Sequence, residues 1–292
     1  MKVLLCGLGA IGSIYADKIS KFANVDFRVL VDKKRLEKYK KNPTHFNNKF
    51  LDLKYILPEE KFLADIIIIA TKNDALLDVI ANLKNFVGKN TIILSLLNGV
   101  GSENLIAERY GEEKVLLSYY IGHSAIREGR NIVHDGINKI VFGSKYDNDD
   151  NVIKVKNFFD IVGINYSIPE DIVSSLWFKF MVNVSLNQTT ALYKLSVGEM
   201  KENDDAVMFF NNLLNEVEQI AIAEQVKFPF DVKNNVLDFV YSMPYESKTS
   251  MLQDVLASRK TEVEIFAGKV IELGIKHNID TPYNVIAFNK LS

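Results

Sequence analysis

The chain has 292 residues, which is enough for two domains that each bury a core of their own. Its 35 basic and 37 acidic side chains leave a net charge of −2, which favours neither a nucleic acid nor an anionic membrane as a partner. No apolar run reaches the roughly 18 residues that span a bilayer, and the single cysteine, Cys6, excludes an internal disulfide. Together with four histidines that lack ligand-like spacing, these features predict a cytoplasmic protein without a metal site.

The first predicted element is an apolar strand over residues 2–6 that leads directly into a glycine-rich turn and a helix. Gly7, Gly9 and Gly12 have the spacing Gly-x-Gly-x-x-Gly, which in this context is typical of dinucleotide-binding proteins. Gly7 permits the sharp turn, Gly9 lets a pyrophosphate approach the backbone, and Gly12 lets the helix lie against the strand. We expect the N–H groups and the dipole of the helix N-terminus to bind the phosphates. The predicted cofactor contacts are Gly7, Leu8, Gly9, Ala10, Ile11 and Gly12.

A second strand is predicted over residues 26–31, and Asp32 follows it directly. Dinucleotide-binding units often have an acid about 20 residues after the glycines that binds the adenosine ribose hydroxyls, so Asp32 is a candidate cofactor contact that favours NAD. The basic run that begins at Lys33 comes next and allows two interpretations. In the first interpretation, Lys33 and its neighbours bind the 2′-phosphate of NADP. In the second, residues 33–41 form the solvated face of a short helix.

Residues 42–49 are rich in asparagine and lysine and are predicted to form a loop. The β-branched run over residues 64–70 predicts a strand that is buried on both faces of a parallel sheet. Lys72 follows this strand at the edge where ligands of open α/β sheets lie. It is therefore a candidate contact for the cofactor or substrate, with an exposed loop lysine as the alternative.

A helix over residues 74–86 and a strand over residues 91–95 are predicted next. Asn98 and the glycine after it form a turn signal at the end of this strand. We interpret Asn98 as a polar arm that reaches the nicotinamide end of the cofactor, and a plain turn residue is the alternative. A further helix is predicted over residues 102–110.

The segment over residues 115–142 alternates in polarity and carries glycines at 122, 129 and 136, with another at 143. This pattern predicts antiparallel strands that extend the sheet. Long helical periodicities replace the alternation of strands and helices after residue 168. The predicted fold is α/β, with an N-terminal Rossmann-like dinucleotide-binding domain over residues 1–168 and an all-α C-terminal domain over residues 169–292.

Residues 172–190 carry large apolar side chains on nearly every side, which predicts one helix that is buried all round. Lys179, Asn183 and Asn187 stand at i, i+4 and i+8 and therefore line one face of this helix. Burying a lysine and two carboxamides is costly without partners, so we interpret the stripe as one wall of a polar cleft that holds water or a polar substrate. The alternative is a lysine that reaches the surface along its apolar stem and asparagines that link helices.

A second polar cluster includes Ser250 and a segment that ends at Glu264. Thr261 and Glu264 have the spacing of a capping box at the start of a helix, which is a structural role. Glu262 is not needed for that box. A carboxylate at a helix start is placed to reach the Lys179 face and to hold its ammonium or a substrate hydroxyl.

In this combination and order, the motifs make the chain similar to the ketopantoate reductase family, also called 2-dehydropantoate 2-reductases, over essentially its full length. The family implies NADPH-dependent reduction of ketopantoate to D-pantoate, a step toward pantothenate and coenzyme A. The resemblance is carried by Gly7-Leu-Gly-Ala-Ile-Gly12, Thr71-Lys72, Asn98-Gly99, Leu176-Trp-Phe-Lys179 with Asn183, Asn187-Gln-Thr-Thr-Ala-Leu192, Ser250-Met-Leu-Gln-Asp254, Arg259-Lys-Thr-Glu262 and Asn278-Ile-Asp-Thr-Pro282-Tyr-Asn284.

The resemblance also implies roles for individual residues. Lys179 would be the general acid that protonates the developing alkoxide, and Glu262 would help to place the substrate. The substrate's carboxylate and hydroxyl would be held by Asn183, Asn187 and Ser250, with Lys72 and Asn98 near the cofactor. The chemistry agrees, because a desolvated cationic lysine both stabilises negative charge on the keto oxygen and supplies the proton.

Two positions depart from the family pattern. Asp32 stands where the family usually has an arginine for the 2′-phosphate, so the resemblance implies NADP(H) while Asp32 admits NAD(H). Gln188 stands where proline usually follows the asparagine matched by Asn187, and we expect this change to reshape the substrate pocket. These departures leave two alternatives open: a related D-2-hydroxyacid dehydrogenase with another small 2-oxoacid as substrate, and a dinucleotide-binding sensor without turnover. A helical C-terminal domain of this kind favours a homodimer.

Overall fold

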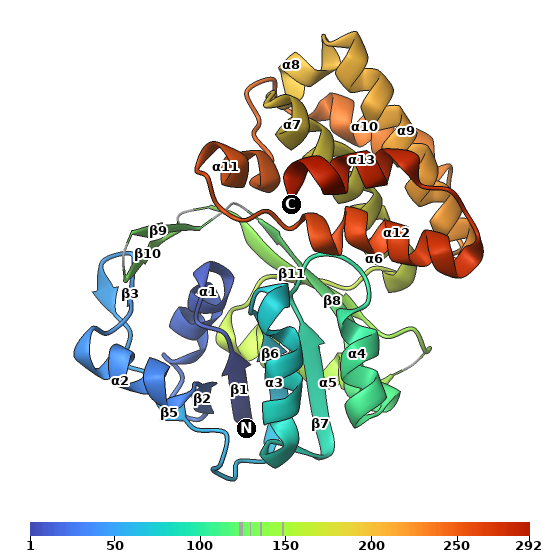
Figure 1. Ribbon diagram of the computed structural model, residues 1–292. Helices are drawn as coiled ribbons and strands as arrows, with labels where there is room; N and C mark the ends of the chain where they lie inside the picture. The colour runs from blue at the N-terminus through green and yellow to red at the C-terminus, as the bar shows by residue number, and fades with distance from the viewer. Residues whose placement is uncertain (123–124, 129, 135, 148) are drawn as a thin grey trace. The chain divides into compact units, whose positions relative to one another are not determined.

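The computed structural model describes residues 1–122, 125–128, 130–134, 136–147 and 149–292 (Figure 1). Gly129, one of the predicted turn glycines, lies outside the described residues. Contacts within the chain separate two compact units. The first contains Met1–Leu97 and Gly101–Ile172, and the second contains Asn98–Val100 and Val173–Ser292. Residues 98–100, which lie between two segments of the first unit along the chain, thus belong with the helical unit.

The first unit is built on an eight-stranded sheet in which the predicted strands of the first hundred residues run parallel. The spatial order is β12-β11-β8-β7-β6-β1-β2-β5. These strands are β1 (Lys2–Cys6), β2 (Asp26–Leu30), β5 (Tyr55–Ile56), β6 (Ala64–Ile69), β7 (Val87–Ser95), β8 (Val115–Gly122), β11 (Asn138–Gly143) and β12 (Tyr166–Ser167). Its helices are α1 (Ala10–Ile19), α2 (Lys33–Lys41), α3 (Leu76–Asn82), α4 (Ser102–Tyr110) and α5 (Asp150–Val162), with short 3₁₀ turns at Asn73–Ala75, Leu83–Asn85 and Glu112–Lys114.

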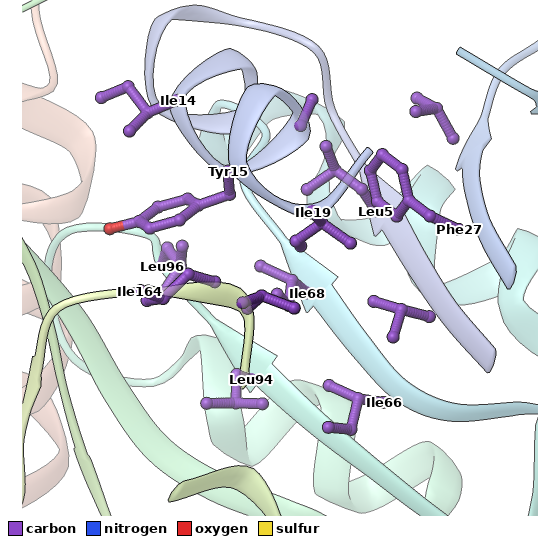
Figure 2. Packing of buried hydrophobic residues seen from close by; sticks show 14 of the residues in the cluster. Leu5, Ile14, Tyr15, Ile19, Phe27, Ile66, Ile68, Leu94, Leu96 and Ile164 are labelled. Atoms are coloured by element: carbon purple, nitrogen blue, oxygen red, sulfur yellow. The ribbon is translucent and has the colours of Figure 1, made fainter. Parts of the chain in front are cut away.

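Both faces of this sheet are buried, because alternate residues of its central strands enter two different cores. Along β6, Ile66 and Ile68 enter the core under α1 and α5, whereas Ile67 and Ile69 enter the core under α3 and α4. Figure 2 shows the first of these cores, with strand side chains facing α1. The prediction of a strand buried on both faces is confirmed. Cys6 lies in the second core, where burial raises the pKa of its thiol far above the ordinary value, so it is a structural residue.

A second sheet corrects two predictions. Its strands are β3 (His45–Phe46), β4 (Lys49–Phe50), β9 (Ile126–Glu128) and β10 (Asn131–Val133), in the order β4-β3-β10-β9. The predicted loop over residues 42–49 therefore contains a hairpin, whose two turn residues, Asn47 and Asn48, both have positive φ as a type I′ turn requires. Of the strands predicted within residues 115–142, β8 and β11 extend the main sheet, whereas β9 and β10 join this one because Ile132 packs into the first core beside Phe46.

The second unit is helical (Figure 1). Its long helix α9 is the centre of the core, and Phe210, Leu213 and Val217 on it are almost completely buried. Among the described residues, we find no helix that has both the length and the apolar character to cross a membrane. The helices are α6 (Ile172–Val182), α7 (Gln188–Tyr193), α8 (Val197–Lys201), α9 (Asp204–Ala223), α10 (Val232–Ser242), α11 (Ser250–Leu256), α12 (Ala267–His277) and α13 (Pro282–Leu291), with a π-helical turn at Asn183–Asn187 and a 3₁₀ turn at Val263–Ile265.

Two local predictions in this unit are wrong. The single helix expected over residues 172–190 is interrupted by the π-helical turn between α6 and α7. Thr261 and Glu264 form no capping box, because the Thr261 hydroxyl donates to the Leu291 carbonyl at 2.7 Å and Glu264 pairs with Lys260. Helix α12 begins only at Ala267, so spacing alone placed the helix start too early.

Candidate active site

The glycine turn connects β1 to α1 and has no space for a side chain at two of its three glycines. Gly7 has a φ of +101°, and a Cβ built there would lie 2.6 Å from the Ala70 carbonyl oxygen. A Cβ on Gly12 would lie 2.0 Å from the Gly7 carbonyl oxygen. Gly9 differs, because a Cβ built there meets no described atom within 4 Å. The protein itself therefore requires glycine at positions 7 and 12, whereas position 9 leaves space beside the backbone for a ligand.

The N-terminus of α1 has the properties of an anion site. The first intrahelical bond runs from the Ser13 N–H to the Gly9 carbonyl at 3.0 Å, so the three amides before Ser13 have no partner within the helix. The first turn has no acidic side chain to oppose the positive end of the helix dipole. The buried hydroxyl oxygens of Ser13 and Thr71 also lack a hydrogen-bond partner among the described residues. These features fit the pyrophosphate of a dinucleotide.

Three neighbouring parallel strands bring the other predicted cofactor contacts of this unit to the same edge of the sheet. Strand β1 lies between β2 and β6. Asp32 follows the C-terminal end of β2, Gly7 that of β1, and Lys72 that of β6. Lys72 is exposed, and Leu8 within the turn is buried. This edge is where dinucleotides bind in open α/β sheets.

Asp32 has a structural role that its sequence position did not reveal. Its carboxylate is the N-cap of α2, and it accepts hydrogen bonds from the Arg35 backbone N–H at 2.6 Å and from the Arg35 guanidinium at 3.1 Å. Lys33 pairs with Glu59 at 3.1 Å. Two of the basic side chains next to Asp32 are thus paired with acids, and α2 exposes its lysines to solvent.

In the helical unit, the structure joins Lys179, Asn98 and Glu262 in one chain of hydrogen bonds. The half-buried Lys179 donates from Nζ to Oδ1 of Asn98 at 3.0 Å. Asn98 in turn donates from Nδ2 to Oε2 of Glu262 at 2.9 Å. Glu262 is the N-cap residue of the 3₁₀ turn Val263–Ile265. The amide of Asn98 thus has its oxygen toward the cation and its nitrogen toward the carboxylate, so both charged groups set its orientation.

Asn183, Asn187 and Ser250 form a second group. Asn187 is 7% exposed, and its Nδ2 lies 3.4 Å from both Oδ1 of Asn183 and Oγ of Ser250. Ser250 is exposed and is the first residue of α11. The structure therefore brings together six predicted residues of the helical unit in two groups. The first contains Lys179 of α6, Asn98 and Glu262, and the second contains Asn183 and Asn187 of the π-helical turn and Ser250.

Thr190 and Thr249 were not identified from the sequence, although they fix the second group. The Thr249 hydroxyl is the N-cap of α11 and lies 2.7 Å from the Thr190 hydroxyl. Thr190 also donates to the Leu186 carbonyl at 2.9 Å. This contact holds the start of α11, and with it Ser250, against the helix that carries Asn187. Thr189 and Thr190 in a buried helix were a visible signal, but the Thr249 partner of Thr190 is 59 residues away.

Comparisons with known proteins agree along the whole chain. Residues 3–146 match the family model described as Ketopantoate reductase PanE/ApbA, and residues 171–292 match the model of its C-terminal part. The 2-dehydropantoate 2-reductase of Aquifex aeolicus is 29% identical over 294 residues, which covers 97% of this chain and 94% of the relative.

Solved structures share the fold over the full length. A ternary complex of D-mandelate dehydrogenase with NADH and anilino(oxo)acetate superposes with a TM-score of 0.86 at 22% identity and covers 100% of this chain and 97% of that one. The dimeric ketopantoate reductase of Staphylococcus aureus gives a TM-score of 0.75 at 22% identity, with the same coverage. At this level of identity, both structures establish the fold alone.

Proposed function

Because the chain belongs to the ketopantoate reductase family, we propose that it reduces the keto group of ketopantoate to give D-pantoate, with a nicotinamide dinucleotide as the reductant. The observation that carries this proposal is the chain of hydrogen bonds from Lys179 through Asn98 to Glu262. Reduction of a keto group places negative charge and then a proton on its oxygen. A partly desolvated ammonium that a neutral amide holds in place meets both requirements.

Lys179 is the general acid in this proposal. Its ammonium has three N–H donors, and the Asn98 oxygen accepts one of them, which fixes the direction of Nζ. Because Lys179 is half-buried, less water screens its charge than at the surface. We expect Lys179 to donate a proton to the keto oxygen as negative charge builds up there. Glu262 keeps the Asn98 amide turned so that its oxygen faces Lys179.

The second group is proposed to bind the substrate's carboxylate and hydroxyl. Asn183 and Asn187 each carry amide N–H donors, and Ser250 carries a hydroxyl that is both donor and acceptor. The two distances of 3.4 Å between them are long for hydrogen bonds, so these groups are weakly bound to one another. A carboxylate would gain shorter, charge-assisted bonds from the same donors.

The residues of the glycine turn and Asp32 are proposed to hold the dinucleotide, which supplies a hydride when bound. The pyrophosphate would lie beside Gly9, on the amides at the start of α1. The Asp32 carboxylate repels a 2′-phosphate, and two of the three cations that follow it, Lys33 and Arg35, are already paired with Glu59 and Asp32. We therefore propose a preference for NADH over NADPH.

The test is a matrix of steady-state rates with the purified chain, in which ketopantoate, pyruvate and branched or aromatic 2-oxoacids are each combined with NADH and NADPH. The highest kcat/KM is expected for ketopantoate with NADH. A higher value for another acid would identify a related D-2-hydroxyacid dehydrogenase. Dinucleotide binding without turnover of any acid would refute the enzyme and favour a sensor.

A homodimer is proposed as the state in solution, since the Staphylococcus aureus relative is dimeric. The helical unit exposes large apolar side chains, including Met208, Phe239 and Ile275, which are candidates for burial in such an interface. Sedimentation velocity would give the mass of two chains if this is right and the mass of one chain, 33.1 kDa, if it is wrong.

A further inference from the structure

The π-helical turn Asn183–Asn187 changes which groups satisfy the backbone carbonyls next to it. In an α-helix the Gln188 N–H would bond to the Val184 carbonyl, four residues before it. Here it bonds to the Ser185 carbonyl instead. The Val184 carbonyl accepts a hydrogen bond from the side chain of Gln188, from Nε2 at 2.8 Å. The Gln188 side chain thus replaces the hydrogen bond that its own backbone does not make.

The same side chain makes two further bonds that leave the helix. Its Oε1 accepts from the Ala267 N–H, at the start of α12, at 3.1 Å. Its Nε2 donates a second hydrogen bond, to Oδ1 of Asn284 on α13, at 3.1 Å. Asn284 donates in turn to the buried Glu216 of α9 at 2.8 Å. Gln188 has no exposed surface, so each of these bonds lies in the interior of the unit.

These bonds use the complete hydrogen-bonding pattern of an amide. An amide nitrogen has two donors, which go to Val184 and Asn284, and its oxygen accepts from Ala267. Glutamate has no such pair of donors, and methionine has neither group, although both are similar in length to glutamine. An apolar side chain here would leave polar groups without partners in the interior.

The position of Gln188 links the two groups of the candidate active site. It follows Asn187 directly, and its partner Ala267 begins the helix that comes after the 3₁₀ turn of Glu262. In the proposed function, the substrate's carboxylate binds the second group (Asn183, Asn187 and Ser250) and its keto oxygen lies at Lys179. The distance between the second group and the Lys179–Asn98–Glu262 chain therefore sets which 2-oxoacid fits. A side chain bonded to both segments fixes that distance.

We propose that Gln188 is a positioning residue that determines selectivity among 2-oxoacids, because its buried amide fixes the π-helical turn bearing Asn183 and Asn187 relative to the segment bearing Glu262. This inference rests on the proposed function. It adds that the size preference of the site depends on a residue that makes no contact with the substrate.

The experiment compares Gln188→Met with the wild-type chain and with a control, Gln219→Met, which makes the same change on the exposed face of α9. We measure kcat and KM for ketopantoate and for pyruvate, together with the dissociation constant of the dinucleotide. For Gln188→Met, we expect the ratio of kcat/KM for ketopantoate to that for pyruvate to fall by about tenfold, the scale of one methylene misfit in a pocket. The dinucleotide constant and the control are expected to stay at wild-type values.

A ratio that stays at the wild-type value in folded Gln188→Met, with only a lower melting temperature, would overturn the proposal and leave Gln188 a core residue. If Gln188→Met does not fold, Gln188→Ser makes the same test, because it removes the bond to Ala267 and leaves space for water to satisfy the freed polar groups. An unchanged ratio there would equally overturn it. A wild-type chain that reduces no 2-oxoacid would refute the proposed function itself, and the inference with it.

Discussion

The glycine turn and the Lys179–Asn98–Glu262 chain are built in opposite ways. The glycine turn depends on side chains that are absent: a Cβ on Gly7 or Gly12 would overlap the backbone, and one on Gly9 would enter open space. The helical group depends on side chains that are present, with an amide held between a cation and a carboxylate. Substitutions in the glycine turn are therefore expected to lower protein stability or ligand affinity. Substitutions in the Lys179–Asn98–Glu262 chain are expected to lower the rate of the chemical step.

This difference gives each region its own experimental signature. Changes in the glycine turn are expected to alter the stability of the protein and its affinity for the dinucleotide. Changes in the helical group are expected to alter the rate of the chemical step while the dinucleotide constant stays the same. A variant of one region that changes both the dinucleotide affinity and the rate of the chemical step would show that binding and chemistry are not separated between the two regions.

The largest effect is expected for Lys179→Ala. We expect kcat to fall by roughly 10² to 10⁴, the usual contribution of a general acid, because no other group supplies the proton at that place. The dinucleotide dissociation constant, measured by fluorescence titration, is expected not to change. Lys276→Ala, on the exposed surface of α12, is the control and should keep the wild-type kcat. An unchanged kcat in Lys179→Ala would remove this lysine from the mechanism.

Asn98→Ala is expected to have the next largest effect. The change removes the amide that joins Lys179 to Glu262, so the amine keeps its charge but loses the hydrogen bond to Asn98. We expect kcat to fall by roughly 10 to 10², less than for loss of the acid itself. Asn212→Ala on α9 removes a comparable amide, whose nitrogen donates to the Met208 carbonyl of the same helix. Equal kcat values for the two variants would show that Asn98 is a plain turn residue.

A pair of glycine variants separates folding from ligand binding. Gly9→Ala places a methyl group in open space at a φ of −86°, so its melting temperature should stay at the wild-type value while dinucleotide affinity falls by about tenfold, or ~1.4 kcal/mol. Gly12→Ala should lower the melting temperature, because its Cβ would lie 2.0 Å from a backbone oxygen. Gly9→Ala with wild-type affinity would indicate that no phosphate lies beside this residue.

The smallest effect is expected at Asp32, and it concerns selectivity. Asp32→Ser removes the negative charge but keeps an oxygen that caps α2, whereas Asp32→Ala also removes the cap at a cost of about 1 kcal/mol. For both variants, we expect the kcat/KM ratio of NADPH to NADH to rise several-fold through loss of repulsion. The melting temperature should fall only for Asp32→Ala. A ratio that does not move would mean that Asp32 acts only as a cap.

The parts of the fold that follow from local patterns were predictable from the sequence. The strand over residues 64–70, the glycine turn and the helix at 102–110 each have their signal within a short window. The hairpin at His45–Phe50 was not predicted, since each of its strands has only two residues and two asparagines were interpreted as loop rather than as a type I′ turn. The π-helical turn was also not predicted, because it depends on which carbonyls the side chains of a buried helix satisfy.

The candidate site shows the same limit. The sequence indicated Lys179, Asn98 and Glu262 from their local contexts and predicted that Glu262 reaches the Lys179 face. It did not reveal that Asn98 lies between the other two, since the bonds span 81 and 164 residues. Asp32 illustrates the converse, because a residue chosen for a ligand turned out to cap a helix as well.

The single-turnover rate of nicotinamide oxidation isolates the chemical step that is assigned to Lys179, since it excludes product release. Wild-type chain and Lys179→Ala, each in excess over a limiting amount of reduced dinucleotide, would be mixed with saturating ketopantoate in a stopped-flow instrument. We expect the same dinucleotide affinity for both proteins and a single-turnover rate at least about 10²-fold lower for Lys179→Ala. Equal single-turnover rates would exclude Lys179 as the general acid, because the proton would then come from another group.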